Sequence, residues 1–297
     1  MNYKTLRFSF LHLLLWTKHV ISFAPKSFRV LNQQGYDGVS FTQVYKARSS
    51  SIVLPLNAIN EEVEALDTMI QEDPVFDVQT TASLIAGQSL LVIVAVIAAK
   101  FLHVDNLGLG TGFDISRESV QNGALLTLPL FFIAFILDQF EKKVPALEDV
   151  SKATQRSVLA VLGGEFNLIN AVAVCITLGA AAGVGEEMLF RGVLQDVLVE
   201  KIGNNFALVS SALIFGALHA VTPLYAFLAA LASLYFGELF IQYNNLAVPI
   251  VCHALYDVGA LYFAHVTVCN MSKEERISLA NWSPPSTNAP SKDSITK

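Results

Sequence analysis

Charged residues are scarce in this chain: Asp, Glu, Lys and Arg make up 15% of its 297 residues, whereas hydrophobic residues make up 53%. Because a soluble domain carries about a quarter of its residues charged, this composition excludes an ordinary soluble protein and indicates a membrane protein. The net charge is −6, and the lysines and arginines form no basic stripe. Nucleic acid is therefore excluded as a partner, and membrane lipid is the expected surrounding.

Cysteine is scarce too, and Cys175, Cys252 and Cys269 form no closely spaced pair. Zinc ribbons and thiol redox sites need cysteines only a few residues apart. The sequence excludes both kinds of site, and we expect these cysteines to fill space as small apolar side chains.

Residues 1–55 have the pattern of a targeting presequence. Lys4 and Arg7 precede an apolar run that is too short to span a membrane, as is typical of a signal peptide. Phe23 then opens the sequence FAP before an acid-poor stretch, which resembles the two-part presequences of complex plastids. We expect an integral protein of the plastid thylakoid or envelope; a protein of the endomembrane system is the alternative.

Six hydrophobic segments predict an all-α fold, a polytopic membrane helix bundle, because a helix needs about 20 apolar residues to cross a bilayer. Pro129 predicts a kink in the second segment, and Glu141–Phe166 is expected to form an amphipathic interfacial helix. An acidic surface segment (56–80), with a short helix at Asn60–Glu72, precedes the membrane domain (81–270), and a disordered tail (271–297) follows it. The six segments begin near residues 81, 123, 168, 206, 223 and 246.

Ionisable side chains lie within three of these apolar segments. Charge at bilayer depth is costly, so such groups are paired, face the protein interior and serve a function. Their sequences are GEEMLFRG (185–192), FGALH (215–219) and HALYD (253–257), which contain Glu186, Glu187, Arg191, Phe215, His219, His253 and Asp257. We expect these residues to line one polar pocket.

Helical spacing separates the roles of the two glutamates. Glu187 and Arg191 are four residues apart, so they share a helix face and are expected to form a structural ion pair. Glu186 is rotated by about 100° from Glu187 and is left free to accept and return a proton. Phe215 is expected to pack in the core and to brace His219.

Two chemistries fit the remaining groups. Glu186, His219, His253 and Asp257 are side chains of the kind that ligate a divalent metal such as zinc, which would activate a water. Alternatively, Glu186 and one histidine activate the water directly while the other groups stabilise an oxyanion. No other cofactor is expected.

The EExxxR, FxxxH and HxxxD spacings, in this order on consecutive apolar segments, resemble the CAAX protease and bacteriocin-processing (Abi) family of intramembrane endopeptidases, which includes the type II CAAX prenyl proteases. The resemblance covers roughly residues 150–268. It implies a helical membrane fold that hydrolyses peptide bonds of a membrane-associated peptide or protein. It also implies that Glu186 activates the water with His219 as its partner, and that His253 and Asp257 polarise the scissile carbonyl.

One residue departs from the family pattern, in which asparagine often stands at the position of Asp257. An ionised aspartate accepts hydrogen bonds but cannot donate one to an oxyanion. We expect Asp257 to orient His253 or to bind a metal instead.

Two other functions use the same residues. A non-proteolytic scaffold or substrate-binding protein of this fold would keep the pocket without turnover, because a fold does not fix a function. A proton-coupled transporter would also need buried acids and histidines, but the sequence shows no inverted repeat of the kind found in such transporters.

Overall fold

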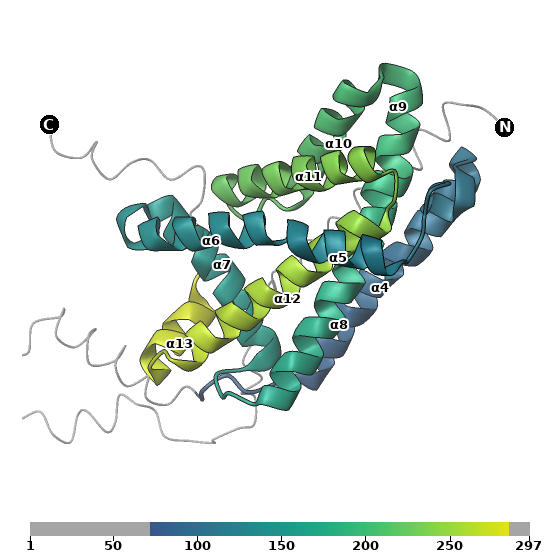
Figure 1. Ribbon diagram of the computed structural model, residues 1–297. Helices are drawn as coiled ribbons and strands as arrows, with labels where there is room; N and C mark the ends of the chain where they lie inside the picture. Colours follow the sequence, from purple (N-terminus) through teal and green to yellow (C-terminus); the bar gives the residue numbers. More distant parts are fainter. Residues whose placement is uncertain (1–71, 285–297) are drawn as a thin grey trace, which may run out of the picture.

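The structure is a computed structural model that describes residues 72–284, and over this range all of its regular elements are helices. They form one bundle (Figure 1), and the predicted all-α fold is confirmed. The helices are α4 (Val78–Leu102), α5 (Arg117–Leu126), α6 (Leu128–Phe140), α7 (Pro145–Leu162), α8 (Leu168–Glu187), the π-helix η3 (Met188–Gln195), α9 (Asp196–Ile202), α10 (Asn204–Leu218), α11 (Pro223–Tyr243), α12 (Ala247–Cys269) and α13 (Lys273–Asn281), with short 3-10 turns at η1 (Asp105–Gly108) and η2 (Glu141–Lys143).

Five stretches of the described chain are long and apolar enough to cross a membrane; they cover residues 78–102, 117–143, 168–202, 223–243 and 247–269. The remaining predicted segment forms α10, which has 15 residues. At roughly 1.5 Å per residue α10 is about 22 Å long, which is less than the roughly 30 Å of a hydrocarbon core. The six predicted hydrophobic segments are confirmed, five as candidate spans of full length and one as a shorter apolar helix.

The second span is broken, as Pro129 predicts. Helix α5 ends at Leu126 and α6 starts at Leu128, with Pro129 in its first turn, where the missing N–H of proline costs no helical hydrogen bond. The hydroxyl of Thr127 lies at the break and is 3.0 Å from the Gly123 carbonyl oxygen and 3.3 Å from that of Cys252. This contact ties the break to α12.

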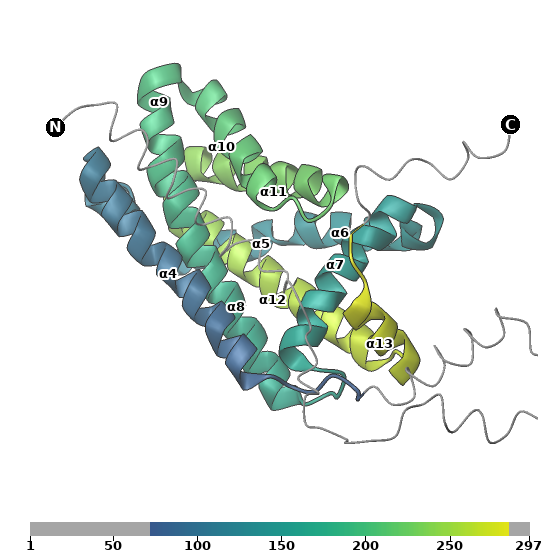
Figure 2. The same ribbon diagram turned by 180° about the vertical axis from the view of Figure 1, so that it is seen from behind.

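Small residues bring α8 and α12 close together. A Cβ atom added to Gly183 would lie 2.9 Å from the Cβ of Ala254, and one added to Gly179 would lie 2.8 Å from the Ala254 carbonyl oxygen. Such positions allow helix backbones to approach within a membrane. The close approach places the end of α8, which carries Glu186, beside the HALYD sequence of α12. On its other side α8 runs alongside α4, as Figure 2 shows.

The chain continues from α8 without a break through η3 into α9. All eight residues of η3 are buried. A π-helix is rare and frequently lies at a functional site; here it begins directly after the paired glutamates and contains Arg191.

The two flanking segments compare differently with their predictions. The predicted amphipathic segment does form a helix, α7, whose last turn packs into the core with Val158 and Leu162 buried, and its place at the membrane interface stays a prediction. The tail that was predicted to be disordered from residue 271 instead forms α13, where Ser272 and Glu275 make a capping box and Arg276 pairs with Asp73. The buried apolar residues of α13 and its capping box stabilise this helix, which the polar composition of the segment did not predict. The predicted presequence, nearly all of the predicted helix at 60–72 and residues 285–297 lie outside the described residues.

Candidate functional site

Three helices bring the predicted catalytic side chains together. Glu186 lies near the end of α8, His219 directly follows α10, and His253 and Asp257 lie one turn apart on α12. The Oε2 atom of Glu186 is 3.7 Å from Nε2 of His219 and 3.9 Å from Nε2 of His253. Oδ2 of Asp257 is 3.5 Å from the same His253 nitrogen.

These separations are longer than a good direct hydrogen bond. They suit polar atoms that share a bridging water. A water beside Glu186 would therefore contact a carboxylate oxygen and an imidazole nitrogen at the same time. The arrangement is compatible with an acid–base pair that acts through one water.

His219 is oriented by the helix that it follows. Its Nδ1 atom is 2.8 Å from the carbonyl oxygen of Phe215, so Nδ1 donates and the neutral ring presents Nε2 as an acceptor towards Glu186. The Phe215 ring stacks on the imidazole with centroids 4.1 Å apart and an interplanar angle of 21°. Phe215 is thus a buried packing residue that braces His219.

The ion pair expected between Glu187 and Arg191 is present, with Oε1 and Nη1 3.0 Å apart and both side chains fully buried. The same Oε1 atom lies 2.7 Å from Nδ1 of His253. Arg191 also donates from Nη2 to the carbonyl oxygen and the hydroxyl of Ser233, at 2.8 and 2.9 Å. Glu187 therefore does more than balance a charge, because it fixes which nitrogen His253 turns towards Glu186.

Sequence reasoning missed the contributions of α11. Phe236 stacks on His253 with centroids 4.6 Å apart and an interplanar angle of 14°. The Arg191 guanidinium lies between two rings, 5.2 Å from the centroid of Phe215 and 5.5 Å from that of Phe236, a cation–π arrangement. In the sequence, Ser233 and Phe236 are an ordinary serine and phenylalanine of an apolar helix, so no local signal distinguishes them from packing residues.

The site is more open on one side than on the other. The side chains of Glu186 and His253 are 4% and 7% exposed, whereas those of His219 and Asp257 are 16% and 29% exposed. A molecule from outside the protein could therefore reach the site through His219 and Asp257. The opposite side is closed by Glu187 and Arg191.

Metal binding was one of the two predicted chemistries. Across residues 72–284 no group of three or more His, Cys, Asp or Glu side chains is arranged to hold a metal ion. Metal assistance at Glu186 stays a prediction.

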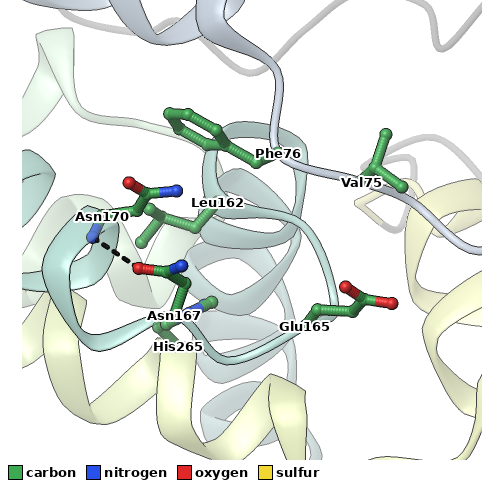
Figure 3. Close-up of a pocket in the computed structure, with 7 residues that line it drawn as sticks. All are labelled: Val75, Phe76, Leu162, Glu165, Asn167, Asn170 and His265. Atoms are coloured by element: carbon green, nitrogen blue, oxygen red, sulfur yellow. Dashed lines mark hydrogen bonds between the residues drawn. The ribbon is translucent and has the colours of Figure 1, made fainter.

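A cavity of about 150 Å³ lies at the opposite end of α8 and is lined by polar and apolar side chains, including Phe76, Leu162, Glu165, Asn167, Asn170 and His265 (Figure 3). Asn167 and Glu186 are separated by roughly 28 Å along the helix. None of the predicted site residues lines this cavity.

A comparison with models of known families gives a match over part of the chain. The family model described as Rce1-like, type II CAAX prenyl endopeptidase Rce1-like, matches residues 168–259. The matched part runs from the start of α8 into α12 and contains all three motifs. No curated protein and no solved structure matches the chain.

Proposed function

We propose that this chain, which carries a domain of the Rce1-like type II CAAX prenyl endopeptidase family over residues 168–259, hydrolyses peptide bonds of a membrane-associated peptide or protein. The observation that carries the proposal is the placement of the Glu186 carboxylate within 4 Å of two imidazole nitrogens, inside apolar helices. A charged group at such depth is costly unless it serves a function.

The reaction begins with a water held by Glu186 and His219. The carboxylate of Glu186 accepts a proton from the water as the oxygen adds to the carbonyl carbon of the scissile bond. Glu186 then returns this proton to the amide nitrogen, and the carbon–nitrogen bond breaks. The products are a new carboxyl terminus and a new amine, and Glu186 is regenerated.

The remaining residues hold this pair in place. The 2.7 Å contact from Glu187 to Nδ1 of His253 directs Nε2 of that ring towards the reacting groups. Arg191 fixes Glu187 in turn, and Asp257 limits the rotation of His253 from the open side. Supports of this kind keep reacting groups within the narrow range of geometry that catalysis needs.

The decisive variant is Glu186→Gln, which keeps the shape of the side chain and removes the proton acceptor. In the purified full-length protein in lipid nanodiscs, supplied with a library of fluorogenic peptides, we expect the cleavage rate to fall at least 100-fold, the usual scale for loss of a general base. The matched control is Glu148→Gln on α7, because Glu148 is half-exposed and forms an ion pair with Lys152, away from Glu186. Equal rates for Glu186→Gln and wild type would remove the proposal.

Further experiments test metal dependence and the alternative function as a scaffold. A chelator series would lower the rate only if a divalent metal takes part. A membrane scaffold of the same fold would instead show no cleavage, and Glu186→Gln would then restore a null strain as well as wild type does.

A fluorescent fusion of residues 1–55 tests the predicted plastid targeting. Fluorescence in the secretory pathway and never in the plastid would contradict that prediction.

A further inference from the structure

The cavity at the start of α8 lies where three candidate membrane spans begin or end. It is lined by Phe76 just before α4, by Asn167 at the start of α8 and by His265 near the end of α12. Its volume of about 150 Å³ is roughly ten times the space that a single water requires. The cavity therefore has room for a group of several heavy atoms at the boundary of the membrane domain.

The most buried polar side chain of this cavity is that of His265, which is 1% exposed. Its ring stacks on Phe166 with centroids 5.8 Å apart and an interplanar angle of 23°. Within residues 72–284 the polar neighbour of its two nitrogens is the Cys269 sulfur, at 3.7 and 3.6 Å. Sulfur is a weak hydrogen-bonding partner, and buried polar groups are rarely left without a good one. A molecule in the cavity would supply that partner to His265.

The rim of the cavity carries three further polar side chains, Glu165, Asn167 and Asn170. The side-chain oxygen of Asn167 accepts from the N–H of Asn170 at 3.0 Å and thereby caps α8 (Figure 3). In the described part of the chain, neither asparagine uses its side-chain NH₂ group in a hydrogen bond. An amide and a neutral imidazole each carry a donor and an acceptor. The cavity thus suits a ligand whose polar groups also do both.

The charges around the cavity disfavour an anionic ligand. Glu165 is an exposed carboxylate in the cavity wall, and it would repel a phosphate. Arg276 lies close to Gly164, but its guanidinium is bound to Asp73 and to the carbonyl oxygen of Met271. An ammonium group would suit the carboxylate but cannot accept from the amide NH₂ groups. Hydroxyl groups donate and accept, so an uncharged, hydroxyl-rich group fits all four polar side chains.

The surroundings of the cavity indicate that a lipid carries this group. Phe166 and Leu168 beside it are exposed apolar side chains. Ile169, Val172 and Ile176 are also exposed, and their spacing of three and four residues places them on one face of α8. In a membrane this face lies against acyl chains. A lipid bound here would have its headgroup in the cavity and a chain along this face.

We propose that the cavity binds the sugar headgroup of a neutral glycolipid, whose hydroxyls hydrogen-bond His265 and the polar side chains of the rim. The cavity lies at the opposite end of α8 from Glu186 and shares no residue with the proposed peptidase site. The inference therefore stands independently of the proposed function. A lipid held in this way would join α8, α12 and the segment before α4.

Native mass spectrometry of the full-length protein in detergent tests the inference. The probes are a glycosyl diacylglycerol, a phosphatidylcholine and a phosphatidylglycerol with the same acyl chains. We expect one glycolipid to bind with a Kd at least about tenfold below those of both phospholipids, which corresponds to about 1.4 kcal/mol. This is the scale of one net hydrogen bond.

Two variants locate the binding. His265→Phe keeps a ring against Phe166 and removes both nitrogens, and Asn170→Leu removes the amide but keeps the backbone N–H that Asn167 caps. We expect each variant to bind the three lipids with affinities equal within about threefold. The matched control is Asn270→Ala, which removes an exposed asparagine at the end of α12 outside the cavity and should keep the tenfold preference.

Circular dichroism identifies variants that keep the wild-type helicity, and these decide the result. Equal affinities of the wild-type protein for the three lipids would overturn the inference. Tightest binding of phosphatidylglycerol would also overturn it, because the site would then recognise an anion. A glycolipid preference that survives in His265→Phe and in Asn170→Leu would show that the lipid binds elsewhere, and the assignment to this cavity would be wrong.

Discussion

Removal of the buried Arg191 guanidinium should destabilise the protein strongly, because it breaks a fully buried ion pair. Arg191→Met keeps much of the volume but leaves Glu187 as an uncompensated charge in a fully buried position. It also leaves the carbonyl oxygen of Ser233 without its donor at 2.8 Å. Breaking a buried pair by removing one partner costs roughly 3–5 kcal/mol, so we expect a loss of this size.

The double variant Glu187→Gln, Arg191→Met separates charge from packing. With no carboxylate left to bury, we expect most of the lost stability to return, because a neutral pair avoids the desolvation cost of a single ion. Activity should not return, because Nδ1 of His253 then faces an amide instead of the carboxylate that lies 2.7 Å away in the wild type. Compared with Arg191→Met, the double variant would thus regain stability without regaining activity.

Thermal unfolding in detergent, followed with a thiol-reactive dye, measures the effect. Cys175 and Cys252 are buried and would react on unfolding, whereas Cys269 is partly exposed and sets the baseline. A cost below about 1 kcal/mol for Arg191→Met, the range of an exposed ion pair, would contradict the reasoning. So would a double variant that is no more stable than the single one.

Two further effects concern the backbone and the helix ends. A Cβ atom at Gly192 would lie 1.7 Å from the carbonyl oxygen of Gly108, so Gly192→Ala should lower stability by about 1–3 kcal/mol through overpacking; a thermal midpoint equal to that of wild type would show that η3 can shift freely. Asp77 caps α4, and hydrogen bonds from the hydroxyl and N–H of Thr80 lower the pKa of its carboxyl below 3.8, against a smaller opposing effect of burial. Its contribution to stability is therefore complete above pH 4 and is lost as the pH falls through the folded value. Because the group is largely exposed, the loss should be under about 1 kcal/mol, and Asp77→Asn should abolish it in thermal scans from pH 3 to 6.

Much of the fold could be predicted from the sequence, because membrane helices are recognised by their length and their apolar composition. The break at Pro129 and the close approach of α8 and α12 at Gly179 and Gly183 follow from local chemistry. The length of α10 and the presence of α13 do not. Both depend on tertiary packing, which decides where a helix ends and whether a polar segment folds.

The candidate site shows the same division. The motif spacing predicts the Glu187–Arg191 pair, because residues four apart meet on one helix face. The contact between Glu187 and His253 joins residues 66 positions apart, and periodicity within one helix carries no signal for it. The π-helix is also invisible, because its hydrogen-bond register depends on how buried residues pack, not on a distinctive composition.

Cleavage in water enriched in oxygen-18 tests the central claim most directly, which is that Glu186 activates a water that attacks the peptide bond. Under single-turnover conditions, we expect one heavy oxygen in the new carboxylate formed by the wild-type protein. The Glu186→Gln variant should form at least 100-fold less of this product. A Glu186→Gln variant that releases labelled product at the wild-type rate would contradict the account.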